Sequence, residues 1–126
     1  MAETTARAGK QGKSRANTPD PDFDWREVTY LVQLSRALDR IEETRLVPER
    51  KVLYQFSARG HDVAQVMLGT RLSHAHDGAC GYYRSRPLLL SLGVPLADAL
   101  GSGMGREGGY SDGRDIGSAG QPLGFG

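Results

Sequence analysis

Glycine is distributed very unevenly along this chain, and the distribution limits where a folded core can form. Of the 126 residues, 17 are glycine, and ten of these lie at or after Gly101. Residues without side chains leave little apolar surface to bury and are expensive to order, so we expect residues 101–126 to form a glycine-rich loop and a flexible tail. The hydrophobic core must therefore come from residues ahead of this region.

The first residues carry positive charge and proline but few large apolar side chains. Within residues 1–16 four basic residues stand against one acidic residue, Glu3, and Pro19 and Pro21 follow. Low hydrophobicity with like charge does not repay the entropy of ordering, so we expect 1–23 to be a disordered basic arm. Contact of this arm with RNA or an anionic surface is the functional alternative. The folded part is then confined to residues 24–100.

Charge and cysteine content exclude several classes of protein. Lys plus Arg number 16 and Asp plus Glu 15, and a net charge of +1 argues against nucleic-acid binding through bulk charge. The single cysteine, Cys80, excludes an internal disulfide framework and a zinc site of several thiolates, and we expect it to be a small buried residue. No apolar run approaches roughly 18 residues and the N-terminus lacks a secretory signal. These features predict a cytoplasmic protein without a membrane partner.

Residues 24–46 show the pattern of one long amphipathic helix. Asp24 is placed to cap its N-terminus, with Glu27 three residues on as in a capping box. Pro48 disfavours helix for the residue before it, so the helix should end near residue 46. The charged residues, Glu42 among them, fall mostly on the side opposite one apolar stripe, whose members recur every three or four residues: Val28, Leu31, Leu34, Leu38 and Ile41.

The remaining apolar residues predict shorter elements and a mainly α fold. The segment 51–56 is aromatic and branched, typical of an extended stretch or a helix end. A second helix begins near Gly60 and Asp62 and is nearly all apolar, so we expect it to be buried. After a loop at 73–81, two short helices over 87–92 and 95–100 each have proline in the first turn, and Gly93 closes the first of them.

The most promising chemistry lies in the run Tyr82-Tyr83-Arg84-Ser85-Arg86, directly ahead of the helix expected from Pro87. Guanidinium groups pair with phosphate oxygens, phenol hydroxyls donate hydrogen bonds, and a helix N-terminus favours an anion. The run therefore indicates an anion site. The alternative is a surface loop whose tyrosines cover the edge of the core.

Three weaker patterns leave alternatives open. His74, His76 and Asp77 are a possible metal site in a loop, but nothing elsewhere supplies matching ligands. His61 beside Asp62 is either an oriented general base or a polar pair at a helix start. The glycines from 101 to 113 are either a phosphate cradle or a flexible end. None of these patterns assigns a metal ligand or a catalytic residue.

An ordered set of motifs spans roughly residues 24–126. The first motif, at residues 51–66, reads Lys-Val-Leu-Tyr-Gln-Phe-Ser-Ala-Arg-Gly-His-Asp-Val-Ala-Gln-Val. It is followed by Asp77, by Gly-Tyr-Tyr-Arg-Ser-Arg at 81–86, by Leu-Leu-Leu-Ser-Leu-Gly at 88–93 and by a Gly/Arg-rich stretch. In order and spacing this set resembles the thiamine-diphosphate-dependent decarboxylating component of 2-oxo acid dehydrogenase complexes of the pyruvate or branched-chain type. The resemblance is to its alpha subunit, or to the amino-terminal half where alpha and beta are fused.

The resemblance implies a cofactor site and a fold. The family's Tyr-Arg pair contacts the cofactor diphosphate, and it corresponds to Tyr83 and Arg84, with Tyr82 as the adjacent contact. Asp62 stands where the family usually has Glu. The implied fold is the amino-terminal helical part of a thiamine-diphosphate-binding α/β fold, with most of the sheet absent.

The resemblance also implies a reaction and partners. The family carries out oxidative decarboxylation of a 2-oxo acid and passes the acyl group to lipoyl groups of an acyltransferase component. Magnesium is implied, but its Gly-Asp-Gly and Asn pattern is missing, because Ser111 replaces the first glycine before Asp112 and no suitable Asn follows. We therefore expect a fragment that is inactive alone and whose partner is the remainder of the enzyme or a beta subunit.

Overall fold

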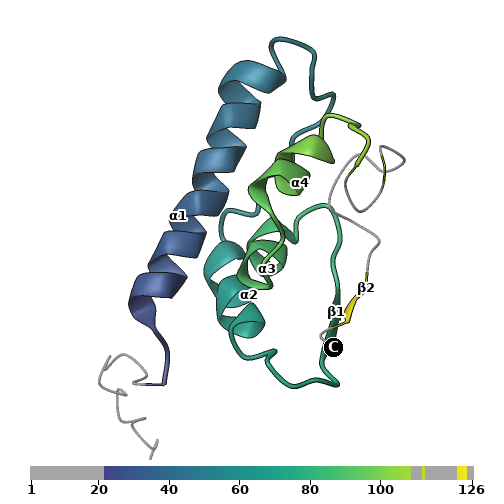
Figure 1. The fold of residues 1–126 in the computed structure, drawn as a ribbon. Coiled ribbons are helices and arrows are strands. Elements are labelled where there is room, and N and C mark those ends of the chain that lie inside the picture. The colour runs from purple at the N-terminus through teal and green to yellow at the C-terminus, as the bar shows by residue number, and fades with distance from the viewer. Residues whose placement is uncertain (1–21, 109–111, 113–121, 125–126) are drawn as a thin grey trace, which may run out of the picture.

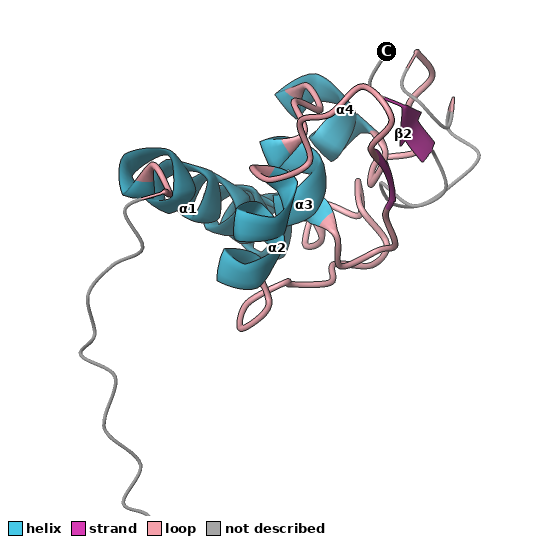
Figure 2. Ribbon diagram, turned by 90° about the horizontal axis from the view of Figure 1, so that it is seen from below, coloured by secondary structure: helices cyan, strands magenta, loops and turns pink. Residues whose placement is uncertain are grey.

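The chain is mainly helical, as the sequence predicts. A computed structural model describes residues 22–108, 112 and 122–124, so the expectations for residues 1–21 and for most of the tail lie outside the described residues. The elements, in chain order, are α1 (Trp25–Ile41), the π-helical turn η1 (Glu42–Leu46), α2 (Asp62–Gly69), β1 (Gly78–Cys80), α3 (Arg86–Ser91), α4 (Leu96–Gly101) and β2 (Pro122–Gly124). In Figures 1 and 2 the long α1 lies along one side, α2, α3 and α4 pack beside it, and the two strands lie at the far side.

The start of α1 confirms the predicted cap. Asp24 has extended backbone angles, and its Oδ1 accepts hydrogen bonds from the amides of Arg26 at 2.9 Å and Glu27 at 3.2 Å. Phe23, which the sequence assigns to the N-terminal arm, packs instead against the core. Its ring lies 4.1 Å from the guanidinium carbon of Arg71. The cap and this contact fix where the chain enters the helix.

The buried face of α1 is rotated relative to the predicted apolar stripe. Ile41 is 37% exposed, whereas Asp39 and Glu42 are each 2% exposed and Ser35 is 1% exposed. The expectation that Glu42 lies on the solvent side is therefore wrong. A pattern of apolar residues alone misses this, because the buried carboxylates are stabilised by an arginine far away in the sequence, described below.

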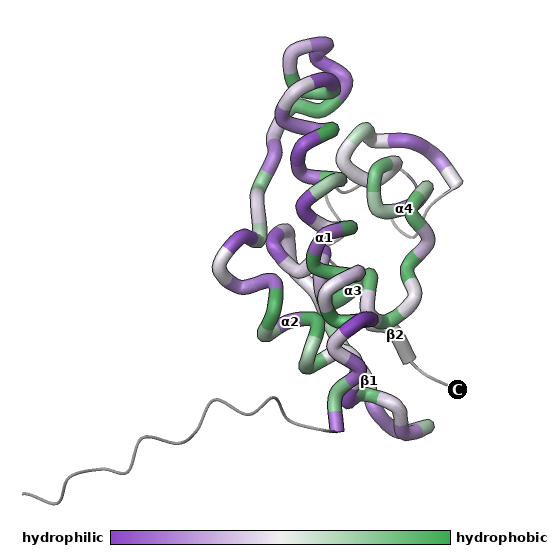
Figure 3. The backbone as a smooth tube through the Cα atoms, turned by 90° about the vertical axis from the view of Figure 1, so that its left-hand side faces the viewer, coloured by the Kyte–Doolittle hydropathy of each residue, from purple (hydrophilic) through white to green (hydrophobic). Residues whose placement is uncertain are grey.

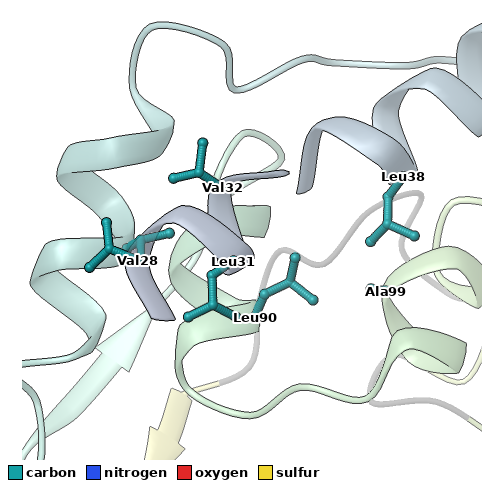
Figure 4. Close-up of a cluster of buried hydrophobic side chains, with 7 residues drawn as sticks. Val28, Leu31, Val32, Leu38, Leu90 and Ala99 are labelled. Atoms are coloured by element: carbon teal, nitrogen blue, oxygen red, sulfur yellow. The ribbon is translucent and has the colours of Figure 1, made fainter. Parts of the chain in front are cut away.

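Four helices contribute to one small core. Its buried members are Val28, Leu31, Val32 and Leu38 of α1, Val66 of α2, Leu90 of α3 and Ala99 of α4. Figure 4 shows Leu31 of α1 beside Leu90 and Leu38 of α1 pointing toward Ala99. Burial of apolar surface at about 25 cal/mol per Å² makes this cluster the main source of stability.

The second helix is buried on one face only, which corrects the expectation that it is buried throughout. Val66 is fully buried, but Val63 is 43% and Leu68 53% exposed. The buried face approaches α3 very closely at Gly69: a Cβ there would meet Ser91 Oγ at 1.6 Å and the carbonyl oxygen of Leu88 at 3.3 Å. Only a glycine allows α2 and α3 to pack at this distance.

The end of α3 follows the predicted glycine stop. Gly93 has φ +86°, its amide donates to the carbonyl of Leu90 at 3.1 Å, and the amide of Val94 donates to the carbonyl of Leu89 at 3.0 Å. These two bonds form a Schellman motif, and Val94 and Leu89 are both buried beside it. The turn sends the chain back into α4.

Two strands replace parts of the expected loop and tail. β1 pairs antiparallel with β2, with Ala79 opposite Leu123. Cys80, at the end of β1, is exposed rather than buried, because alternate residues of this two-stranded ribbon face away from the core. A strand pair so distant in sequence leaves no local signal in a glycine-rich tail.

Hydropathy along the backbone follows this arrangement. Figure 3 shows apolar stretches where α1, α2 and α3 meet and polar stretches in the turn at the top of α1. No helix in the described part of the chain is both long and apolar enough to cross a membrane.

The close approach at Gly69 can be tested by adding one methyl group. Gly69→Ala forces Ser91 and the α3 backbone to move, and we expect a loss of about 1–3 kcal/mol in the free energy of unfolding. Gly101→Ala is the matched control, because it also ends a helix and its Cβ would come no closer than 3.8 Å to Arg106 Cβ. Urea denaturation followed by circular dichroism measures both. Equal stability of the two variants would contradict the packing.

Candidate functional site

The candidate anion-binding residues lie in a tight turn directly before α3. The amide of Ser85 donates to the carbonyl of Tyr82 at 2.8 Å, and the amide of Tyr82 donates to Ser85 Oγ at 3.1 Å. Gly81 begins this turn, and a Cβ there would lie 3.2 Å from the Cβ of Ser85. Ser85 is buried and fixes the turn, while Tyr82 and Tyr83 stay about half exposed.

Four aromatic rings from two separate segments meet beside this turn. The ring of Tyr83 lies 4.6 Å from that of Phe56 and 5.1 Å from that of Tyr82, and Tyr54 stacks near Phe56 at 6.3 Å, all between ring centroids. We call Tyr54, Phe56, Tyr82 and Tyr83 the aromatic cluster; each is between 41% and 64% exposed. From the sequence, only Tyr82 and Tyr83 of these four residues were predicted to belong to the site. The aromatic residues within 51–56 were the sequence signal for the other two rings.

Arg84 lies against this cluster and is held by the backbone. Its Nη1 donates to the carbonyl of Ser57 at 2.9 Å, and its guanidinium carbon lies 5.5 Å from the centre of the Tyr83 ring and 5.9 Å from that of Phe56. Its own carbonyl accepts a hydrogen bond from Gln65 Nε2 at 3.0 Å. Within the described part of the chain no carboxylate comes within ion-pair distance of this guanidinium. The site therefore presents a positive charge that no carboxylate of the described residues neutralises.

Arg86, two residues further on, has the opposite environment. Its Nη1 donates to Asp39 Oδ1 at 2.9 Å and its Nη2 to Glu42 Oε1 at 2.5 Å, and its side chain is 15% exposed. Ser57 Oγ donates to the second oxygen of Asp39 at 2.8 Å. We call Arg86, Asp39 and Glu42 the buried triad. Of the two guanidinium groups that the sequence placed in one anion site, only Arg84 remains available.

Burial changes the protonation of these carboxylates in different directions. Burial raises the pKa of Glu42 above its ordinary value, although the hydrogen bond from Arg86 opposes this. Burial also acts to raise the pKa of Asp62, but the hydrogen bond and charge of Arg36, whose Nε lies 2.6 Å from Asp62 Oδ2, outweigh it and the pKa is lowered. The same contact raises the pKa of Arg36. Asp62 is thus a structural carboxylate held by α1.

Within the described residues, the histidine side chains form neither a hydrogen-bonded pair with a carboxylate nor a group of three metal ligands. His61 is exposed and makes no side-chain cap, and the Asp62 carboxylate is engaged by Arg36 and the amide of Val63 rather than by His61. Across 22–108, 112 and 122–124, no group of three or more His, Cys, Asp or Glu gathers to hold a metal ion. In the proposed metal loop, His74 Nδ1 accepts the amide of His76, and Asp77 Oδ2 accepts the amide of His74.

The glycine-rich stretch is only partly described. Gly105 and Gly108 have positive φ, and the amide of Gly108 donates to Asp112 Oδ1 at 2.9 Å. This is a local turn, and among the described residues it makes no hydrogen bond or ion pair with a charged group of the candidate site. The remainder of the predicted phosphate cradle lies outside the described residues.

Comparison with known proteins identifies no family for this chain. No family model matches the chain, and no solved structure matches it.

The buried triad and the partly buried Arg84 should respond differently to truncation. Arg86→Met leaves Asp39 and Glu42 as buried carboxylates without a cation, and we expect a loss of about 3–5 kcal/mol in the free energy of unfolding. Arg84→Met removes one hydrogen bond to a carbonyl and should cost about 1 kcal/mol. Thermal and urea denaturation measure both, and similar losses would contradict the assignment of Arg86 to the interior.

Acid should weaken the Arg36–Asp62 contact in a defined direction. Because the folded pKa of Asp62 lies below its unfolded value of about 3.8, this contact stabilises the fold above that pH and is lost as pH falls through the folded pKa. Asp62→Asn should therefore cost about 1 kcal/mol at neutral pH, since Arg36 is partly screened by solvent, and less in acid. Urea unfolding across a pH series measures the difference. Glu42→Gln is the comparison: because the Glu42 pKa is raised, the wild type should gain stability relative to this variant as pH falls.

Proposed function

We propose that this chain provides part of the diphosphate-binding site of a thiamine-diphosphate-dependent 2-oxo acid dehydrogenase, in its decarboxylating component. The observation that carries the proposal is Arg84. Among the described arginines that are partly buried, Arg36 and Arg86 are paired with carboxylates and Arg84 is not, whereas the other described arginines are exposed. A partly buried guanidinium without a carboxylate partner favours an anionic ligand. The ordered motifs that resemble the family give this anion its proposed identity.

The residues beside Arg84 suit a diphosphate. Tyr82 and Tyr83 are half exposed and carry hydroxyl groups that donate hydrogen bonds to phosphate oxygens. Among the residues that the structure describes, Arg84 donates a side-chain hydrogen bond to the Ser57 carbonyl alone, and because a guanidinium has five N–H groups, others are available there for a ligand. No metal site is derived, because the described residues bring no three metal-ligating side chains together.

The roles of these side chains are binding and orientation. Arg84 would neutralise phosphate charge, and the Ser57 carbonyl would keep its guanidinium plane in place. Tyr82 and Tyr83 would orient the phosphate oxygens and shield them from water on one side. Thiamine diphosphate, when bound, supplies the electron sink for decarboxylation of the 2-oxo acid, and the acyl group then passes to the lipoyl acyltransferase of the complex. In this proposal the described residues hold the cofactor and break no bonds, so the chain alone is inactive.

A second candidate is a non-enzymatic helical interaction module. The observation that favours it is that two apolar side chains of α2, Val63 and Leu68, are 43% and 53% exposed. Large apolar side chains that stay exposed are available to contact another protein. The two functions are separated by ligand binding, since an interaction module has no requirement for a diphosphate.

Calorimetry with inorganic pyrophosphate, and then with thiamine diphosphate and magnesium, tests the cofactor site on the full chain. We expect binding of both ligands, weakened about tenfold or more by Arg84→Gln, because a charge-assisted hydrogen bond pair is lost. Arg26→Gln is the matched control: Arg26 is exposed at the far end of α1 and lies outside the site.

Tyr83→Phe adds a finer test, since it removes only the hydroxyl and keeps the ring against Phe56. A smaller loss of pyrophosphate affinity than in Arg84→Gln is expected. Absence of binding, or equal binding by the Arg84→Gln and Arg26→Gln proteins, would overturn the proposed function.

A further inference from the structure

The chain between η1 and α2 has an open backbone edge. In the described part of the chain, none of the amide groups of residues 53–57 donates a hydrogen bond, and of their carbonyls only that of Ser57 accepts one, from Arg84. The turn residues that follow η1 and the residues that begin α2 pair their backbone groups within the fold. Backbone groups left unpaired along several consecutive residues are a template for pairing with another chain.

Three of the five side chains along this edge are apolar and exposed. Leu53 is 67%, Tyr54 64% and Phe56 41% exposed. Tyr54 and Phe56 are two residues apart and their rings stack at 6.3 Å with planes 17° apart, so they line the same side of the segment. Tyr83 extends this surface from the neighbouring turn through its contact with Phe56. The edge thus combines free main-chain groups with adjoining aromatic surface, the combination used when an extended peptide adds to a fold.

The charge around the edge is positive. Arg50 at its start and Arg84 at its end have no carboxylate within ion-pair distance in the part of the chain that the structure describes. The other cations beside it, Lys51 and Arg59, are neutralised by Glu49 and Glu43 at 2.6 Å and 3.0 Å. The two unpaired arginines lie at opposite ends of the segment, so the complementary partner is an acidic one.

We propose that residues 53–57 receive an extended acidic peptide segment of a partner protein. The peptide pairs its main chain with the open amides and carbonyls over about 16 Å, the length of five extended residues. Its apolar side chains pack against Tyr54, Phe56 and Tyr83, and its carboxylates meet Arg50 and Arg84. Figure 3 shows the path of the chain from the turn after α1 to α2, with no other element drawn across its outer side.

Fluorescence anisotropy with synthetic octapeptides tests this on the full chain without thiamine diphosphate. The probe alternates Glu and Val, a second peptide alternates Lys and Val, and a third is the Glu-Val peptide with alternate amides N-methylated. We expect the Glu-Val peptide to bind at least about tenfold more tightly than either of the others. The Lys-Val peptide lacks the complementary charge, and the N-methylated peptide lacks alternate main-chain donors. Equal binding of the three peptides, or no binding of the Glu-Val peptide, overturns the proposal.

Two variants separate this surface from the proposed cofactor site. Tyr54→Ser should weaken the Glu-Val peptide about tenfold and leave pyrophosphate binding unchanged, since Tyr54 lies on the edge and not in the turn before α3. Arg84→Gln should weaken both ligands. Peptide binding that survives Tyr54→Ser at full strength overturns the proposed surface while leaving the cofactor site to its own test.

Sedimentation of the chain alone separates an acidic partner from a second copy of this chain. We expect a monomer across the concentrations used for anisotropy, because a two-fold contact would bring the unpaired arginines of both copies together. A dimer that Tyr54→Ser dissociates would overturn the proposal in favour of self-association.

Discussion

The buried triad of Arg86, Asp39 and Glu42 is the interaction on which the rest of the structure depends. It joins the end of α1 and the start of η1 to the first residue of α3, across 47 and 44 positions of sequence. Three charges removed from water are tolerated only when each is paired, and here both carboxylates meet one guanidinium. Ser57 donates to the same Asp39, so the segment leading to α2 is tied to this point as well.

The π-helical turn is part of the same arrangement. In η1 the amide of Val47 donates to the carbonyl of Glu42 at 2.9 Å, which spans five residues instead of four. The wider turn begins at the residue whose carboxylate is buried, and Gly103 lies against that carboxylate, where a Cβ would come within 3.4 Å of Oε1. Such turns are frequent at functional sites, and this one positions a residue of the triad. With α3 fixed by Arg86, the turn before it directs Tyr82, Tyr83 and Arg84 outward.

Local signals in the sequence were sufficient for much of the fold. The Asp24 cap, the glycine stop at Gly93 and the two short proline-started helices depend on residues within a few positions of one another, and all are present. The misses share a different cause. The burial of Glu42 depends on a distant arginine, and the exposure of Cys80 on a strand pair that closes across more than 40 residues. No helical periodicity encodes either of these.

The candidate site shows the same division. The sequence identified Tyr82, Tyr83 and Arg84 from residue type and proximity, and the structure places these three in one turn. It could not separate Arg84 from Arg86, because two guanidiniums two residues apart look alike until their partners are known. Phe56 contacts Tyr83 through tertiary packing, and Tyr54 lies beside the site only through its contact with Phe56, although the aromatic character of both was visible in the sequence.

Arg84 belongs to both surfaces proposed for this chain, because its guanidinium has enough N–H donors to contact the backbone and a ligand at the same time. One nitrogen holds the carbonyl of Ser57, which keeps the open edge beside the aromatic cluster. The remaining N–H groups form a fork that suits a carboxylate as well as a phosphate. A ligand on that fork therefore does not require release of Ser57, and the edge keeps its place whichever anion is bound. Replacement by lysine would not preserve this, since a single ammonium group lacks the planar fork that engages a backbone carbonyl and an anion together.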